Sequence, residues 1–293
     1  MRKQTLSSAR DISYAHAAAS RSGRALIRLL ENSTGRLGLI RRARGYENEV
    51  EAGAGFFEVM AARYGLSLDV VQGTLETVPR EGPVICIANH PYGILDGLML
   101  GQILSRTRGD FKIMAHSAFS CAPDLHRHLL PISFDAGRAA VARNLQTRSE
   151  ALGYLAQGGA IGIFPGGTVS TAARPFSRPM DPGWRSFTAR MIAKSRATVV
   201  PIYFDGHTSR MFQIASHLHS TLRMGLLIKE FRDRVDTPVR VVIGKPLCRD
   251  VLDPLSGDAK AMMDFLRKAT YELSPEPLVS TELGFEFEQH HRA

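Results

Sequence analysis

Short apolar runs and longer amphipathic stretches alternate along this chain. Runs rich in β-branched residues predict buried strands, and apolar residues spaced three and four apart predict helices. Strands are expected over residues 66–72, 83–88, 111–115, 129–133, 160–164, 198–203, 224–229 and 238–243. Helices are expected over residues 93–104, 138–156, 184–193 and 258–273.

This alternation predicts an α/β fold with a mixed, mostly parallel sheet flanked by helices. With 293 residues, 44% of them hydrophobic, the chain can bury the core of one large domain. We expect that domain over residues 66–275. A basic, amphipathic helical segment over residues 1–65 precedes it, and a polar, peripheral tail over residues 276–293 follows.

The strand expected over residues 83–88 leads directly into His90 and, six positions later, Asp96. Ligands of α/β sheets bind beyond the carboxyl ends of the strands. A neutral imidazole accepts a proton from a hydroxyl when a carboxylate holds its other ring nitrogen. His90 and Asp96 are therefore a candidate acid/base pair. In the plainer alternative, which spacing alone does not exclude, His90 closes a turn and Asp96 serves the first helical turn.

A second strand, over residues 160–164, runs into Pro165, Gly166, Gly167 and Thr168. Paired glycines after a strand let backbone amides approach a ligand closely, as an oxyanion or a phosphate requires. The alternative is a tight turn that needs a positive φ angle. Either interpretation places a second special loop near the first, if the two strands are neighbours.

The two blocks together resemble the glycerolipid acyltransferase family, meaning the 1-acylglycerol-3-phosphate acyltransferases and their bacterial hemolysin-like and lyso-aminolipid O-acyltransferase relatives. The resemblance spans residues 70–246. The family carries Asn-His-x4-Asp, Phe-Pro-Glu-Gly-Thr-Arg and a later Val-Pro strand; this chain has Asn89-His90 with Asp96, Phe164 to Thr168, and Val200-Pro201. The resemblance implies an acyltransferase-like fold, with His90 as the general base and Asp96 as its partner. It also implies an acyl carrier protein or coenzyme A thioester as acyl donor, and no cofactor.

The departures from the family pattern indicate the acceptor. Five residues separate His90 from Asp96 where the family has four, and Gly93 is expected to absorb the extra one. Gly166 and Val169 replace a glutamate and an arginine that the family associates with its glycerol-phosphate acceptor. Losing a guanidinium removes a bidentate phosphate ligand. The expected acceptor is therefore a lyso-aminolipid, similar to lyso-ornithine lipid or a sulfonate aminolipid. The alternatives are a 1-acylglycerol-3-phosphate acyltransferase and a non-catalytic, membrane-associated lipid-binding protein.

Candidate substrate-binding residues come from both blocks and from two later turns. Amides near Gly166 and Gly167 are candidates for the oxyanion, and Thr168 for orienting the acceptor. Arg138 begins an expected helix, and a position on the solvated face of that helix is the plainer explanation for it than substrate binding. His207 and Arg210 could line the head-group site, but a polar turn followed by a helix capped at Ser209 is the favoured interpretation. The full set is Asn89, Tyr92, Gly93, Arg138, Phe164, Pro165, Gly166, Gly167, Thr168, His207 and Arg210.

The net charge of +9 is concentrated at the start of the chain. Residues 1–44 hold ten lysines or arginines and two acids, and Leu26, Leu29, Leu30 and Leu37 recur there at helical spacing. A basic amphipathic helix suits an anionic membrane surface, and it also suits an acidic carrier protein. The alternative, that these leucines pack on the domain, is compatible with both. The segment lacks the interleaved aromatic residues of a nucleic-acid binder.

Other classes and locations are excluded by what the sequence lacks. It has no G-x-S-x-G elbow, no Walker loop and no G-x-G-x-x-G, which argues against serine hydrolases and nucleotide enzymes. His217 and His219 have no third ligand at a metal spacing, so no metal is expected. Three cysteines without a C-x-x-C motif fit a reducing compartment. With no apolar run of spanning length and no signal peptide, we expect a peripheral protein on the cytoplasmic face of a bacterial inner membrane.

Overall fold

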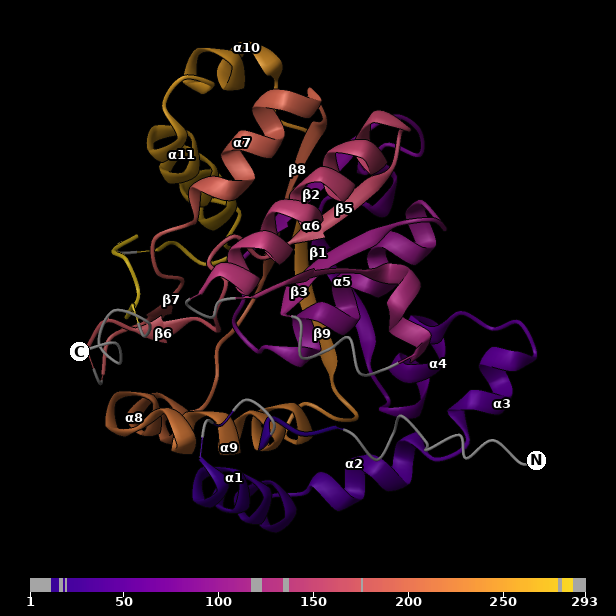
Figure 1. Ribbon diagram of the computed structural model, residues 1–293, viewed down its shortest axis with the longest axis vertical. Helices are drawn as coiled ribbons and strands as arrows, with labels where there is room; N and C mark the ends of the chain where they lie inside the picture. Colours follow the sequence, from indigo (N-terminus) through magenta and orange to yellow (C-terminus); the bar gives the residue numbers. More distant parts are fainter. Residues whose placement is uncertain are drawn as a thin grey trace.

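The structure, a computed structural model, describes residues 12–15, 18, 20–116, 123–133, 137–174, 176–278 and 281–286. Within these residues one sheet has the strand order β1-β9-β8-β2-β5-β3-β4 (Figure 1). Neighbouring strands are parallel except β8 and β9, which are antiparallel. The expected mixed, mostly parallel sheet is confirmed. Its strands are β1 (Ser67–Gln72), β2 (Val84–Ala88), β3 (Lys112–His116), β4 (Leu129–Ile132), β5 (Ala160–Ile163), β8 (Thr198–Phe204) and β9 (Pro238–Ile243).

Helices cover both faces of the sheet and bury two core clusters. Side chains of β2 alternate between the faces: Cys86 and Ala88 lie in one cluster, Ile85 and Ile87 in the other. The first cluster packs against α4 (Phe56–Arg63), α5 (Ile94–Thr107) and α9 (Ser220–Arg232). The second packs against α6 (Arg138–Ala156), α7 (Ser186–Ser195) and α11 (Ala259–Tyr271). Buried on both faces, β2 is the centre of the domain.

Smaller elements complete the described chain. A separate pair of short antiparallel strands, β6 and β7, follows the loop after β5. Short helices lie at α3, α10, η3, η5 and η6. Their bounds are β6 (Thr171–Ala172), β7 (Pro179–Met180), α3 (Tyr46–Glu51), α10 (Arg249–Leu252), η3 (Leu75–Thr77), η5 (Pro123–His128) and η6 (Asp253–Leu255).

The N-terminal helices α1 (Arg21–Ser33) and α2 (Arg36–Ala43) lie beside α9, although most of the sequence separates them (Figure 1). Helix α8 (Arg210–Leu218) also packs on α9. The buried carboxylate of Glu31 ties the preceding segment down. It accepts hydrogen bonds of 2.6 Å from the Ser13 hydroxyl and from the Tyr14 amide. Tyr14 thereby packs against the cluster that contains Val169 and Leu227.

Most of the expected elements are present, and one is wrong. The strands expected over residues 66–72, 83–88, 111–115, 129–133, 160–164, 198–203 and 238–243 are confirmed to within one residue at each end, and the four expected helices are present. Residues 224–229, expected to be a strand, lie inside α9 instead. That helix is buried along most of its length, including Leu226, Leu227, Ile228 and Phe231. A helix covered on several sides has no polar face to reveal its period.

In the part of the chain that the structure describes, no helix combines the length and the apolar character that a membrane span needs.

Candidate functional site

The two loops singled out in the sequence emerge side by side at one edge of the sheet. Ile87 of β2 pairs with Ile163 of the parallel neighbour β5. His90 and Gly166 each follow their paired isoleucine by three residues, so both lie at the same level beyond the strand ends. The rings of His90 and Phe164 stack at a centroid distance of 4.2 Å and an angle of 27°. The sheet register therefore joins the two blocks into one site.

His90 and Asp96 form a close pair. The Nδ1 atom of His90 lies 3.0 Å from Oδ2 of Asp96, which is in the first turn of α5. The same Oδ2 accepts hydrogen bonds from the amides of Tyr92 (2.7 Å) and Gly93 (2.9 Å). Both interpretations of Asp96 thus describe one carboxylate, which supports the turn and faces the imidazole. Gly93 has a φ angle of +82°, which lets the turn hold its extra residue.

Burial shapes the chemistry of this pair. The Asp96 side chain is fully buried, and its burial raises the pKa of the carboxyl, while His90 and the two amides act in the opposite direction. The His90 side chain is 18% exposed, yet its Nδ1 atom is buried. The exposed part of the ring therefore lies away from Nδ1, and the carboxylate lies behind that atom. A carboxylate in this position can hold the orientation of a histidine that acts as a general base.

Asp181 is a site residue that the sequence analysis missed. Its carboxylate is fully buried and accepts hydrogen bonds from the His90 amide (3.2 Å), the Ser170 hydroxyl and the Trp184 indole (2.9 Å). Ser170 also donates its amide to the His90 carbonyl at 2.8 Å. Asp181 therefore links the His90 loop to the loop over residues 165–170, the glycine loop. The Trp184 ring also lies in the second core cluster, so this residue ties Asp181 to the core.

The tail of the chain reaches the same place. Gly284 donates its amide to the Asp181 carbonyl at 2.9 Å, and Phe285 donates its amide to the Thr171 carbonyl at 3.0 Å. Arg267 of α11 donates to the Asp181 carbonyl at 3.0 Å as well. A segment expected to be peripheral is thus hydrogen-bonded to residues next to the site.

One backbone amide of the glycine loop is hydrogen-bonded within the turn, and two others are not. Gly167 has a φ angle of +69° and donates its amide to the Phe164 carbonyl at 3.0 Å, so that amide serves the turn. Among the described residues, the amides of Gly166 and Thr168 meet no hydrogen-bond acceptor. These two, rather than Gly167, are the candidate oxyanion donors. A Cβ atom at Gly166 would lie 3.3 Å from the Asp181 side chain, so a side chain there would strain the contact.

The side chains of Asn89 and Tyr92, two candidate binding residues, form hydrogen bonds within the protein. The Asn89 amide group donates to the Phe204 carbonyl (2.9 Å) and accepts from the Phe204 amide (2.7 Å). The Tyr92 hydroxyl donates to the Asp205 carbonyl at 3.1 Å, and the Arg234 guanidinium lies 4.5 Å from its ring centre. Both side chains are buried and join the end of β2 to the end of β8. They support the loop that carries His90.

The remaining candidates are spread around the site. Pro165 is buried and accepts a hydrogen bond from the Arg185 amide on its carbonyl at 3.0 Å. Arg138 is an exposed residue at the start of α6. His207 and Arg210 are exposed between β8 and α8, where Ser209 caps the helix by accepting from the Phe212 amide. The capped turn favoured from sequence is confirmed.

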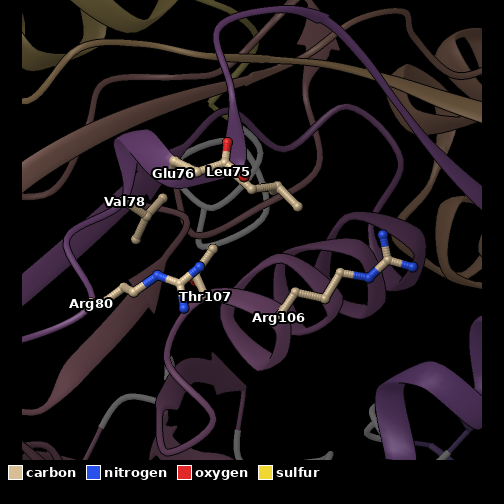
Figure 2. A pocket seen from close by; sticks show the side chains of 6 residues that line it. All are labelled: Leu75, Glu76, Val78, Arg80, Arg106 and Thr107. Carbon is tan, nitrogen blue, oxygen red and sulfur yellow. The ribbon is translucent and has the colours of Figure 1, made fainter.

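Two other features lie apart from the chemistry. No cluster of metal-ligating side chains occurs among residues the structure describes. A hollow lined by Leu75, Glu76, Val78, Arg80, Arg106 and Thr107 is shown in Figure 2. It lies at the carboxyl end of α5, whereas His90 lies at the amino end, and a 14-residue helix is about 21 Å long. We therefore do not assign this hollow to the His90 site.

Comparison with known proteins gives the following matches. The Acyltransferase family model matches residues 70–205. A protein of Phocaeicola vulgatus named lyso-glycine lipid O-acyltransferase is 24% identical over 206 residues, covering 68% of this chain and 71% of its own length. The protein of that name from Bacteroides thetaiotaomicron is 25% identical over 235 residues, covering 78% and 82%. The crystal structure of the 1-acyl-sn-glycerophosphate acyltransferase from Thermotoga maritima superposes with a TM-score of 0.46 at 16% identity, covering 90% of this chain and 87% of that one.

Proposed function

We propose that this chain is an acyltransferase that acylates the hydroxyl of a lyso-aminolipid with His90 as general base. The proposal is supported by the match of residues 70–205 to the Acyltransferase family model and by two relatives that are named O-acyltransferases. The observation that carries the base assignment is the 3.0 Å contact between Nδ1 of His90 and the buried Asp96 carboxylate. With Nδ1 held from behind, Nε2 is the nitrogen that faces a substrate.

The proposed reaction transfers one acyl group and returns every proton. Nε2 of His90 takes the proton of the acceptor hydroxyl while the hydroxyl oxygen attacks the thioester carbonyl. The tetrahedral intermediate collapses, the carbon–sulfur bond breaks and the imidazolium returns its proton to the leaving thiolate. The Asp96 carboxylate stabilises the imidazolium between these two steps. The products are an ester on the lipid and a free thiol on the donor.

The amides of Gly166 and Thr168 are the proposed oxyanion donors. Fixed backbone donors aimed at the developing charge are worth about 2.7–4 kcal/mol each in acyl transfer. Their loop is held against His90 by the stacked Phe164 ring and by the hydrogen bonds of Ser170. The donor thioester, on acyl carrier protein or coenzyme A, would place its carbonyl oxygen there.

The lyso-aminolipid acceptor is supported by chemistry and by the relatives. The glycine loop carries Gly166 and Val169 at positions where a phosphate-binding loop of this kind has charged side chains. Both curated relatives are named for a lyso-glycine lipid, an acceptor with an amino-acid head group. The second candidate acceptor is 1-acylglycerol-3-phosphate, the acceptor of the glycerolipid acyltransferases that the two sequence blocks resemble.

We also propose that the N-terminal helices rest on the anionic cytoplasmic face of the inner membrane. The Leu26, Leu29 and Leu37 side chains are 42%, 66% and 56% exposed, close to exposed arginines such as Arg24 and Arg41. Exposed leucines beside cations suit the boundary between acyl chains and anionic headgroups. On α8, Met211, Ile214 and Leu218 are also exposed. The buried side of this helix is tied to β6, because Gln213 accepts a hydrogen bond from the Ala172 amide.

The test is an acyl-transfer assay with defined acceptors. Purified protein would be incubated with acyl carrier protein thioester or acyl-coenzyme A and with lyso-glycine lipid, lyso-ornithine lipid or lysophosphatidic acid, and the products identified by mass spectrometry. Acylation of an aminolipid that is lost in His90→Ala supports the proposal. Faster turnover of lysophosphatidic acid would overturn the acceptor assignment while leaving the His90 chemistry in place.

A further inference from the structure

A buried arginine from a distant helix reaches into the glycine loop. Arg223 of α9 is 4% exposed, and its guanidinium donates to four oxygens. Nη2 donates to the Thr168 hydroxyl (3.1 Å) and the Val169 carbonyl (2.8 Å), whereas Nη1 donates to the hydroxyls of Thr171 (2.6 Å) and Ser216 (2.8 Å). The loop that holds the candidate oxyanion amides is thus clamped by one cation.

The Arg223 guanidinium is largely shielded from solvent. The Arg223 guanidinium carbon lies 4.9 Å from the ring centre of Phe212, so an aromatic face covers it. Burial lowers the pKa of Arg223 to about 10, which leaves the group charged at neutral pH. Burying a charge costs free energy unless it is fully hydrogen-bonded. Retaining a guanidinium here, where an apolar side chain would cost less, indicates that its donors serve the loop.

The clamp determines what the Thr168 hydroxyl can do. A hydroxyl has one hydrogen and two lone pairs, and a lone pair of Thr168 already accepts from Nη2 of Arg223. The hydroxyl hydrogen is therefore directed away from the cation. Thr168 is only half-buried, in contrast to Val169 and Ser170 beside it. Its remaining donor is available to a ligand in the site.

We propose that Arg223 is a positioning residue for acyl transfer, which fixes the glycine loop and makes Thr168 a hydrogen-bond donor to the lyso-lipid acceptor. This inference rests on the proposed function, since the acceptor is the lipid assigned above. It gives the loop a cation from outside its own sequence, at the place where Val169 supplies none. The acceptor group that Thr168 meets is a carbonyl or carboxylate oxygen, such as an amino-acid head group offers.

The test separates the two nitrogens of the guanidinium. Thr168→Val removes the proposed donor, Thr168→Ser restores it, and Arg223→Met removes the clamp. Ser216→Ala is the matched control, because it deletes an Nη1 partner but leaves the contact with Thr168. We expect Thr168→Val to raise the acceptor KM about 10-fold with an unchanged donor KM, the size of one hydrogen bond. Thr168→Ser should recover most of this, and Ser216→Ala should have the KM of the wild type.

Arg223→Met should lower kcat as well as acceptor affinity, and the Thr168→Val change should then add little in the double variant. Hydrogen–deuterium exchange of a peptide over residues 164–171 gives a second readout that needs no turnover. Exchange should accelerate in Arg223→Met and stay unchanged in Ser216→Ala. The proposal is overturned if Thr168→Val and Ser216→Ala have equal acceptor KM values, or if the loop exchanges equally in Arg223→Met and wild type. A wild-type protein that acylates no lyso-lipid would instead refute the proposed function.

Discussion

The amide of His90 donates to the carboxylate of Asp181 over 3.2 Å, across 91 residues of sequence. The same carboxylate receives the Ser170 hydroxyl and the Trp184 indole. One buried acid thus fixes the backbone of the proposed base and the end of the glycine loop together. Their relative position depends on Asp181 more than on any single loop residue.

Replacing Asp181 should damage both turnover and stability. Asp181→Asn keeps one oxygen and exchanges the other for a donor, which then faces the donors that the carboxylate accepted. We expect a loss of about 1–3 kcal/mol in the free energy of unfolding and a lower kcat. Trp184→Phe is the comparison, because it removes only the indole donor and should lower Tm with little change in kcat. Equal kcat in Asp181→Asn and wild type would show that Asp181 does not position His90.

His90→Ala should remove turnover and leave the fold in place. General-base catalysis raises the rate about 10²- to 10⁴-fold, so kcat should fall by about that factor in the variant. His90 lies in a loop beyond β2, and the core clusters do not include it, so Tm should stay close to that of the wild type. The assay is acyl transfer beside a thermal melt. A variant with more than a tenth of the wild-type kcat would exclude His90 as the base.

Asp96→Asn should separate stability from activity in a pH-dependent way. Burial raises the folded-state pKa of Asp96, so the folded chain holds that proton more tightly than the unfolded chain. The corresponding stability is fully present below the unfolded pKa, about 3.9, and is lost as pH rises through the higher folded pKa. Asparagine does not titrate, so the stability of the variant should increase relative to that of the wild type as pH rises through that window. Its kcat should be lower than that of the wild type, because the carboxylate behind His90 is gone. Denaturant unfolding at several pH values measures this. A difference that stays constant with pH would contradict it.

Membrane binding should depend on the leucines of α1 and α2. Exchanging Leu26, Leu29 and Leu37 for serine should weaken binding to vesicles that contain anionic phospholipid by at least about 10-fold, since burying each leucine contributes roughly 1.5–3 kcal/mol. Val141 and Leu145 of α6 are similarly exposed and provide the control pair. They belong to a helix that covers the opposite face of the sheet, so their serine variants should bind vesicles normally. Equal loss in both sets would argue against a specific docking face.

The cysteines should differ sharply in reactivity. Cys86 is buried in β2, and burial raises the pKa of its thiol to about 12, whereas Cys248 is exposed. Alkylation of the native protein followed by peptide mass spectrometry should modify Cys248 and leave Cys86 untouched until denaturant is added. Labelling of Cys86 at the rate of Cys248 would show that the sheet opens on that timescale. Cys121 lies outside the described residues.

Much of the fold and part of the candidate site could be predicted from local sequence patterns. The residues that act through partners far away in the sequence could not. The strands of the sheet were predictable because their apolar runs are short and end at turn residues. The His90–Asp96 pair was predictable because both residues lie on one turn. Asp181 and Arg223 were not, because their importance comes from partners 91 and 55 positions away. In sequence, Asp181 only opens an Asp-Pro-Gly turn, and Arg223 directly precedes residues 224–229, which were expected to be a strand. A charged residue next to an expected apolar element was the available signal for Arg223.

The hydrogen bonds of Gly284 and Phe285 have a consequence for limited proteolysis. Their amides bind the carbonyls of Asp181 and Thr171 beside the site, although residues 281–286 belong to no helix or strand. A protease that cuts the chain between α11 and Gly284 would release these hydrogen bonds while the sheet and its two core clusters keep their packing. Such a cut should therefore lower the rate of acyl transfer before it lowers the thermal stability of the fold.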